Sequence, residues 1–348
     1  MQAPQACIHR KPPYHIPMTF LIDKNIAIRL QGPSNDFQRA FRHNHPESLP
    51  PKSVVFITRQ DDRECDFLSL ILASQDIGVV RIDSDGELNK ELLPIDNFGR
   101  LVTEHGKTTV AVAWIRHFSR ESIKNISYVK EETIYIKDQA ISYIQTLEEI
   151  ALFSVNRFCN ARSRLAQIQL ADTIGFTTPQ TFIGYEEGFP FSIAKPIGPH
   201  WVEPTPGTLL GAMPKRLKLD QSTHDEPVPL LFQRYMNSEY ELRCYVIDQE
   251  VIVFRVSGYD TAGDLWLENN GVSVSLYNPT QRVKDILIEY SQLSGCNLCA
   301  IDLLIQGGAP IFLECNVIFD WLFYEERAGT NIVSDAIARY LQRTLNDA

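Results

Sequence analysis

The stretch of residues 300–316 constrains the fold of this chain more than any other part of its sequence. It reads AIDLLIQGGAPIFLECN, two apolar runs separated by Gly307 and Gly308, and this pattern predicts a β-hairpin with a tight turn. Asp302 and Glu314 lie inside the apolar runs, one on each predicted strand. Because an ionised carboxylate out of water costs several kcal/mol, each of these acids needs a compensating partner.

Two interpretations of these acids are open. Asp302, Glu314 and the following Asn316 supply hard oxygen ligands, which suit Mg²⁺, an ion that uses one or two carboxylates together with waters and nucleotide phosphates. In the alternative, Asp302 caps a turn and Glu314 pairs with an arginine. The spacing of the three residues is compatible with both the metal site and the structural roles.

The length and charge of the chain limit what it can be. A chain of 348 residues predicts two domains or one multi-lobed fold with a large buried interior. The formal net charge of -10 argues against nucleic acid as a general partner. No run of about 18 apolar residues is present, and the N-terminus lacks the apolar core of a signal peptide, so we expect a cytoplasmic protein without a membrane partner.

Cysteine usage points to the same compartment. Seven cysteines are scattered along the chain, an odd number without the spacing of a small disulfide scaffold, which is typical of a reducing cytosol. Cys296 and Cys299 form a single CxxC motif, and no second cysteine pair or CxxxxH partner accompanies it. We therefore expect this motif where a helix end runs into a buried strand, and not at a zinc ion.

The N-terminal half of the chain predicts an extension followed by an open α/β domain. Residues 1–50 are rich in proline and histidine and contain one apolar run, 18–28, so we expect an irregular or partly strand-like extension. Residues 51–157 then predict strands at 54–58, 79–82 and 108–115 and helices at 62–77 and 131–153. The turn after the first strand lacks GxGxxG, which removes the main support for a dinucleotide-binding interpretation.

Residues 158–230 predict a small central subdomain. A helix at 161–174 is followed by a strand at 191–195, which ends in Lys195. A lysine in a strand of buried character needs an anion or a carboxylate nearby. The next segment, 197–226, is rich in Gly, Pro, Thr and Lys and has the composition of either a mobile lid or a plain surface loop.

Residues 231–348 predict a C-terminal antiparallel subdomain. Its periodicity gives a strand, a hairpin, an amphipathic helix, the hairpin described above and a final helix, at 230–236, 241–255, 281–293, 300–316 and 331–345. The first hairpin turns at Asp248-Gln249 and carries Arg243 and Arg255 on its two strands. Guanidinium groups that project from rigid strands are well suited to bind phosphate oxygens.

The order of these pieces resembles the ATP-grasp superfamily of carboxylate-amine ligases. The matching pieces are a helix before GFTTPQT, a strand that ends in Lys195-Pro196, the hinge FQRYM, the ribbon ELRCYVIDQEVIVFR and the hairpin AIDLL…FLECN. Within the superfamily the chain is most similar to the graspetide, or microviridin-type, ligases, which cross-link side chains of ribosomally made precursor peptides. The resemblance covers about residues 51–345. It implies an α/β fold of the ATP-grasp type, with an N-terminal open α/β (pre-ATP-grasp) domain, a central small domain and a C-terminal antiparallel-sheet domain.

The resemblance also implies a nucleotide site. The α- and β-phosphates of ATP would be held by Lys195 and by Arg164, which occupies a helix position where lysine is commoner in the family. The hinge would lie along the adenine, with backbone groups reading its edge, and an acid would bind the ribose; the residues concerned are Gln233, Tyr235, Met236 and Glu241.

The same resemblance assigns residues to the reacting phosphates. Arg255 would lie against the γ-phosphate or the acyl phosphate, and Arg243 is the second arginine assigned to catalysis. Two Mg²⁺ ions that bridge the β- and γ-phosphates would be bound by Asp302, Glu314 and Asn316.

The acceptor side departs from the family pattern. Graspetide ligases usually continue after the metal-binding Asn with Pro, Gly and Gln-Trp, whereas this chain has VIFDW at 317–321. Because this loop faces the acceptor in the family, we expect an acceptor that differs from a microviridin-type core peptide. Phe319 and Trp321 are equally compatible with a core position. Asp264 and His200 are candidates for a catalytic base only through their proximity to the motifs.

The implied reaction activates a carboxylate with ATP as an acyl phosphate, which an amine or a hydroxyl then attacks, with release of ADP and phosphate. The first hypothesis is a ligase that modifies or macrocyclises a ribosomal precursor peptide, with ATP and Mg²⁺ as cofactors and relatives that are often homodimers. The second is a small-molecule amino acid or peptide ligase in a biosynthetic pathway. The third is a nucleotide-binding module without turnover, against which the complete set of Lys195, Asp302, Glu314 and Asn316 argues.

Overall fold

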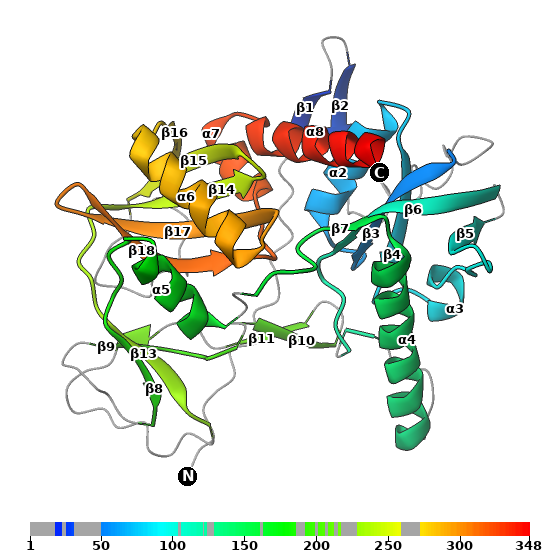
Figure 1. Ribbon diagram of the computed structural model, residues 1–348, viewed down its shortest axis with the longest axis horizontal. Coiled ribbons are helices and arrows are strands. Elements are labelled where there is room, and N and C mark those ends of the chain that lie inside the picture. Colours follow the sequence, from blue (N-terminus) through cyan, green and yellow to red (C-terminus); the bar gives the residue numbers. More distant parts are fainter. Residues whose placement is uncertain are drawn as a thin grey trace. The chain divides into compact units, whose positions relative to one another are not determined.

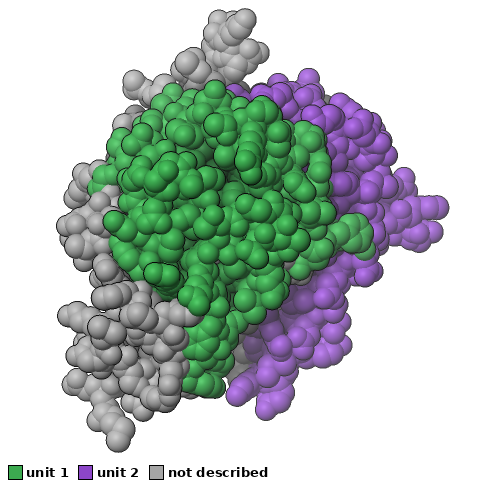
Figure 2. Space-filling view, turned by 60° about the vertical axis from the view of Figure 1, so that its left-hand side comes forward, with its two compact units in different colours: residues 1–7, 156–202, 210–333 green, residues 8–155, 203–209, 334–348 purple. Residues whose placement is uncertain are grey.

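The computed structural model divides the chain into two compact units. It describes residues 18–22, 26–30, 50–103, 106–120, 122–123, 129–160, 163–185, 192–198, 201–205, 208–211, 215–216, 228–258 and 272–348. Unit 1 comprises residues 1–7, 156–202 and 210–333, and unit 2 comprises residues 8–155, 203–209 and 334–348; Figure 2 draws them in green and purple. The finer domain boundaries at 50/51, 157/158 and 230/231 stay predictions.

The sheet of unit 2 has β3 and β6 as its inner strands (Figure 1). Its order is β4-β3-β6-β5, with β7 paired to β6, and β3 runs parallel to both β4 and β6. The strands are β3 (Lys52–Thr58), β4 (Gly78–Asp83), β5 (Arg100–Thr103), β6 (Gly106–Ile115) and β7 (Phe153–Ser154), and the helices are α2 (Arg63–Ala73), α3 (Leu88–Glu91) and α4 (Lys130–Ile150). The three predicted strands and two predicted helices are confirmed, but the helices end earlier than predicted, at Ala73 and Ile150, and α3, β5 and β7 were not predicted from the sequence.

Strand β3 reads as a continuous apolar run because both of its faces are buried. Residues 54–57 have no exposed surface. Helix α4 packs on the face that carries Val55 and Ile57, through Ile144 and Leu147. Full burial of an aliphatic side chain of this kind contributes about 1.5–3 kcal/mol, so this contact is a main source of stability in unit 2.

A buried ion pair lies at the carboxyl ends of β3 and β6. Asp62, the N-cap of α2, accepts hydrogen bonds from Thr58 Oγ1 at 2.5 Å, from the Cys65 backbone N–H at 3.1 Å and from Arg116 Nε at 3.0 Å. The side chains of Asp62 and Arg116 have no exposed surface. Burial acts to raise the pKa of Asp62, but Arg116, with His117 and Thr58, outweighs it and holds this pKa well below its usual range.

The N-terminal extension contains two strands within its described part. The backbones of β1 (Met18–Ile22) and β2 (Ile26–Leu30) form an antiparallel pair, which confirms the predicted strand-like character. The other residues between 1 and 49 lie outside the described part of the chain.

Unit 1 begins with a helix and a small sheet. Helix α5 (Arg164–Thr173) ends before Gly175, whose φ of 95° only glycine adopts readily. The sheet has the order β12-β9-β13-β8, with β8 (Thr181–Gly184), β9 (Ser192–Lys195), β12 (Lys215–Arg216) and β13 (Leu230–Arg234). Phe182 and Phe232 stack at 5.1 Å between ring centroids, next to Ala194.

The segment predicted as a lid or surface loop, 197–226, falls largely outside the described residues. Its described part contains β12 and a two-stranded sheet of β10 (Trp201–Thr205) and β11 (Thr208–Gly211). The choice between lid and plain surface loop stays open.

The larger sheet of unit 1 is antiparallel throughout, with the order β16-β15-β14-β17-β18 (Figure 1). Its strands are β14 (Tyr240–Ile247), β15 (Glu250–Ser257), β16 (Ser273–Tyr277), β17 (Leu298–Gln306) and β18 (Ala309–Asn316), and unit 1 also contains the helices α6 (Gln281–Ser294) and α7 (Leu322–Ala328). The last helix, α8 (Ile332–Asp347), belongs to unit 2 from residue 334 onward. Both predicted hairpins are confirmed. Gly307 and Gly308 have φ of 58° and 77°, the left-handed pair that a tight two-residue hairpin turn requires.

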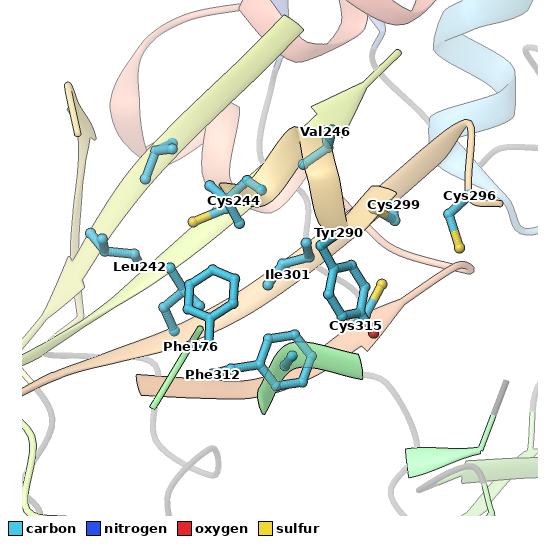
Figure 3. Packing of buried hydrophobic residues seen from close by; sticks show 14 of the residues in the cluster. Phe176, Leu242, Cys244, Val246, Tyr290, Cys296, Cys299, Ile301, Phe312 and Cys315 are labelled. Atoms are coloured by element: carbon cyan, nitrogen blue, oxygen red, sulfur yellow. The ribbon is translucent and has the colours of Figure 1, made fainter. Parts of the chain in front are cut away.

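One face of this sheet forms the core of unit 1 with α5 and α6 (Figure 3). The labelled side chains meet in one cluster, in which the ring of Phe312 lies 5.1 Å from that of Tyr290 and 5.9 Å from that of Phe176. Cys296 and Cys299 are buried in this cluster, between the end of α6 and the start of β17. This is the structural setting that the sequence predicts for the CxxC motif.

Tyr290→Phe is expected to raise the free energy of unfolding by about 1 kcal/mol. Among the described residues the buried Tyr290 hydroxyl has no hydrogen-bond partner, and burial raises its pKa far above the usual range. Phenylalanine keeps the ring contact with Phe312 and removes the unpaired hydroxyl. Urea-induced unfolding measures the change.

Tyr245→Phe is the matched control. Tyr245 is equally buried, but its hydroxyl donates to the Asp320 carbonyl at 2.8 Å. This variant is expected to lower the free energy of unfolding by about 1 kcal/mol, because it removes that hydrogen bond. Equal losses in the two variants would contradict the prediction for Tyr290.

Candidate functional site

Three charged residues form a row across the larger sheet of unit 1. Arg243 on β14 pairs in register with Asp302 on β17, and Asp302 pairs with Glu314 on β18. Neighbours in register project from the same face of a sheet. Leu242 and Ile301, one position away, belong to the core cluster, so the charged row lies on the face opposite to α5 and α6.

The row is connected by hydrogen bonds. Arg243 Nη1 donates to both carboxylate oxygens of Asp302 at 2.8 Å. Asn316 Nδ2 donates to Asp302 Oδ2 at 3.0 Å and to Glu314 Oε1 at 3.4 Å. The two acids and the amide that the family resemblance assigns to a metal are therefore brought together, and a β-bulge next to Asp302 is what aligns it with Glu314.

Two aromatic rings support Arg243. Its guanidinium carbon lies 5.6 Å from the ring centroid of Tyr245 and 5.5 Å from that of Tyr324. Such contacts between cation and ring hold the guanidinium in place on the strand. Neither tyrosine is singled out by the sequence, because an aromatic residue in an apolar run is first read as core.

Lys195 and Arg164 bring positive charge to the acids. Lys195, at the end of β9, is only 6% exposed. Burial lowers its pKa, while Glu314, Asp302 and Glu241 act to raise it, in that order of strength. The prediction that this lysine has carboxylates nearby is confirmed.

Arg164, the first residue of α5, contacts both the charged row and the strand that carries Lys195. Its Nε lies 3.5 Å from Glu314 Oε2, and its Nη1 donates to the Pro196 carbonyl at 2.5 Å. Because Pro196 follows Lys195, Arg164 contacts both the candidate ligand Glu314 and the end of the strand that carries the lysine. An arginine on Glu314 is also what the structural alternative predicts, so this pair is compatible with both interpretations.

The acids of the site disfavour each other's charge. Burial, with the charges of Asp302 and Glu314, raises the pKa of Glu241 to about 7, although Lys195 opposes the shift. Burial also raises the pKa of Asp302, which Arg243 opposes and Glu314 reinforces. A cluster of carboxylates with raised pKa values is typical of a site that binds a cation or reacts.

The raised pKa of Glu241 predicts a pH dependence of the metal-free protein. Between the unfolded value of 4.5 and the folded value of about 7, the native state binds more protons, so stability is lost as the pH rises through this window. Glu241→Gln removes this titration. In the absence of metal, the free energy of unfolding is expected to fall by about 2 kcal/mol less in the variant than in the wild type as the pH rises from about 5 to about 8.

Urea unfolding at several pH values, with a chelator present, measures this difference. Glu289→Gln on α6 is the matched control, because Glu289 is exposed. Identical pH profiles for wild type and Glu241→Gln would show that Glu241 is ionised throughout.

The predicted adenine hinge follows β13. Gln233 is 3% exposed, and its Nε2 donates to Thr181 Oγ1 at 3.3 Å. Within the described part of the chain, its Oε1 has no hydrogen-bond partner. Tyr235 and Met236 are half-buried beyond the end of the strand. Their contact with a nucleotide stays a prediction.

Arg255 lies outside the charged row of Arg243, Asp302 and Glu314. It pairs in register with Leu242, and therefore projects from the sheet face opposite to Arg243. Its side chain is exposed, with the guanidinium carbon 4.0 Å from the ring centroid of Tyr240. The proposed role of Arg255 at the γ-phosphate stays a prediction that the described contacts do not support.

The acceptor-side residues are partly described. Phe319 and Trp321 are buried, and their ring centroids lie 5.7 Å apart, so both belong to the interior of unit 1. The two candidates for a catalytic base, His200 and Asp264, lie outside the described residues.

The chemistry of the donors fits Mg²⁺. Asp302 and Glu314 present carboxylates within hydrogen-bond distance of one carboxamide, that of Asn316. Among the residues described, no group of three or more His, Cys, Asp or Glu side chains is arranged to hold a metal alone. Mg²⁺ does not need such a cage, because it usually keeps waters and phosphates in its coordination shell.

Comparison with known proteins identifies the fold. Residues 215–341 match the model of the RimK-like ATP-grasp domain, and no curated protein matches the chain in sequence. The structure is similar to that of the macrocyclase MdnC from Microcystis aeruginosa MRC, bound with the precursor peptide MdnA. The TM-score is 0.69 at 15% identity, with 85% of this chain and 100% of MdnC covered.

Two further solved structures are similar. The ATP-grasp ligase PsnB, complexed with a minimal precursor, Mg and ADP, has a TM-score of 0.64 at 16% identity, covering 86% of this chain and 100% of PsnB. A RiPP-associated ATP-grasp ligase from Chryseobacterium gregarium, in complex with ADP and a leader and core peptide, has a TM-score of 0.63 at 18% identity, covering 84% and 97%. The chain thus has the ATP-grasp fold, as the sequence predicts. No described helix has the length and apolar character needed to span a membrane.

Proposed function

We propose that this protein is an ATP-dependent ligase that activates a carboxylate as an acyl phosphate and joins it to an amine or a hydroxyl of a precursor peptide. The observation that carries the proposal is that Arg164 lies 3.5 Å from Glu314, whose charge, with that of Asp302, also acts on the buried Lys195, while Asn316 donates to both acids. A site that combines these groups can hold a polyphosphate and a hard cation together.

The peptide part of the proposal is supported by the structural likeness. MdnC, PsnB and the Chryseobacterium ligase were each solved with precursor or leader and core peptides. At identities of 15–18% this likeness concerns the fold, so the peptide substrate of this chain is an inference from it.

In the proposed mechanism the side chains of the site bind, orient and neutralise. Lys195 and Arg164 would hold phosphate oxygens, and Asp302, Glu314 and Asn316 would hold Mg²⁺. When bound, Mg²⁺ would offset the negative charge of the transferring phosphoryl group. Arg243 keeps the Asp302 carboxylate in position through two hydrogen bonds of 2.8 Å.

The hinge and Glu241 would complete the nucleotide-binding site. The backbone of Tyr235 and Met236 would read the adenine edge, next to the buried Gln233, and Glu241 would accept a hydrogen bond from the ribose. No covalent nucleophile is needed, since acyl-phosphate formation by direct attack depends on positioning and on charge neutralisation.

The test is Mg²⁺-dependent release of ADP from ATP, measured with and without a synthetic peptide encoded next to the gene. We expect release that the peptide stimulates, together with peptide product that is lighter by the mass of one water for each bond formed. Omission of Mg²⁺ is expected to abolish both signals.

The outcomes separate the candidate functions. ADP release that depends on amino acids or small carboxylates, and not on peptide, would replace the peptide substrate with a small molecule. Tight ATP binding without ADP release under any acceptor would contradict the ligase function and favour a nucleotide-binding module.

A further inference from the structure

Gln167 binds the backbone of β18 between two residues of the candidate site. The carboxamide of Gln167, on α5, makes two hydrogen bonds to Cys315: Nε2 donates to its carbonyl at 2.8 Å, and Oε1 accepts from its N–H at 3.0 Å. Gln167 is 6% exposed, so these bonds are shielded from water. Cys315 stands between Glu314 and Asn316 in the sequence.

Strand β18 needs this partner because it lies at the edge of its sheet. Among the described strands it pairs with β17 alone. Farther along the same edge, the Phe312 N–H donates to the Thr177 carbonyl at 2.9 Å. At Cys315 the side chain of Gln167 takes the place of a neighbouring strand, because a carboxamide offers one donor and one acceptor side by side, as a backbone does.

The same helix also reaches the carboxylate of Glu314. Arg164 precedes Gln167 by three residues on α5, so both side chains leave the same side of the helix. Arg164 Nε lies 3.5 Å from Glu314 Oε2. Helix α5 therefore contacts β18 twice at this point, once through the backbone of Cys315 and once through the side chain of Glu314.

We propose that Gln167 is a positioning residue for the Mg²⁺ ligands Glu314 and Asn316. This inference rests on the proposed function, because it takes these two residues as ligands. By holding the backbone of Cys315, Gln167 fixes the direction in which the side chains on either side of it leave the strand, towards Asp302. Removal of groups that orient metal ligands typically lowers metal affinity by about 10-fold to 100-fold.

The first test compares Gln167→Met with Gln169→Met. Methionine has nearly the length of glutamine and lacks its donor and acceptor. Gln169 is an exposed residue of the same helix and is the matched control. We expect Gln167→Met to raise the Mg²⁺ concentration for half-maximal ATP consumption by about 10-fold, with a smaller change in kcat, and Gln169→Met to behave as the wild type.

Deuterium exchange of the metal-free protein gives a readout that does not depend on activity. The amide of Cys315 is expected to exchange faster in Gln167→Met than in the wild type or in Gln169→Met, because its acceptor Oε1 is lost.

In a third variant, Gln167→Glu, the Mg²⁺ requirement is expected to depend on pH. A purely structural role of Gln167 would not produce this dependence. A protonated carboxyl group has the same donor and acceptor pattern as the amide, whereas an ionised one has no donor and repels the Cys315 carbonyl. The ratio of the Mg²⁺ requirement of this variant to that of the wild type is therefore expected to fall as the pH is lowered. This test stands if Gln167→Met fails to fold.

The results distinguish this inference from the proposed function. An active wild type with an unchanged Mg²⁺ requirement in Gln167→Met, or a pH-independent ratio in Gln167→Glu, would overturn the inference alone. A wild type that binds or consumes ATP without any dependence on Mg²⁺ would overturn the metal-ligand assignment and, with it, the role of Gln167.

Discussion

Glu314→Gln is expected to lower the rate of Mg²⁺-dependent ADP formation by about a thousandfold, which corresponds to about 4 kcal/mol in the activation barrier. Glutamine keeps the size of the side chain but removes one of the two carboxylates that face Asn316. It also removes the carboxylate with the largest effect in raising the pKa of Lys195. The variant thus loses a proposed metal ligand and favours a neutral lysine at the phosphates.

The measurement is steady-state ADP formation at saturating ATP, over a range of Mg²⁺ concentrations. Glu289→Gln, on the exposed side of α6, is the control for the loss of one negative charge. Circular dichroism should show that Glu314→Gln is folded, since the side chain is half-buried and glutamine fits its space. Activity within about tenfold of the wild type would contradict the metal role and leave Glu314 as the ion-pair partner of Arg164.

The hairpin of β17 and β18 shows both what a local pattern predicts and what it misses. Two glycines with positive φ fix the turn, and counting from it pairs Leu303 with Phe312 and would place Leu313 opposite Asp302. A β-bulge next to Asp302 shifts the register by one residue, so that Glu314 pairs with Asp302 on the face opposite to Ile301 and Cys315. The turn can be read from the 17 residues of this stretch, but the bulge that lets the two acids share a face cannot.

Arg255 shows what the register adds to a pattern read from the sequence, although its role at the γ-phosphate stays a prediction. The two-residue turn at Asp248-Gln249 pairs Ile247 with Glu250, and counting back from it pairs Leu242 with Arg255. Arg255 therefore shares a face with Leu242, and Arg243 projects from the other face. The sequence contains this register, but two arginines on one ribbon suggest a joint role until the pairs are counted.

Gln167 shows what the sequence does not reveal. Helical periodicity places Leu165, Ile168 and Ala171 on one apolar face, yet Leu165 is 36% exposed while Gln167 is buried. The partner of Gln167 is the backbone of Cys315, 148 residues away along the chain. A hydrogen bond to backbone atoms does not require a particular residue type at the partner position, so no sequence motif indicates it.

Arg116→Met is expected to lower the free energy of unfolding by about 3–5 kcal/mol, the largest stability effect that we predict. The guanidinium of Arg116 donates to Asp62 Oδ2 at 3.0 Å, and neither side chain has exposed surface. Methionine fills much of the same space but leaves Asp62 as a buried carboxylate without its nearest cation. Urea-induced unfolding, followed by the fluorescence of Trp114 two residues away, measures the loss.

A double variant separates the unpaired charge from the loss of packing. Asp62→Asn removes the charge and keeps an oxygen that can cap α2 by accepting from the Cys65 N–H, because asparagine is a good N-cap residue. In the background of Arg116→Met, it should recover about half or more of the lost stability, whereas alone it removes the carboxylate that accepts from Arg116 Nε and destabilises. If Asp62→Asn and Arg116→Met were additive, the two residues would act independently and the loss would come from packing. A strong coupling would identify the interaction between these two buried charges as the source of the loss.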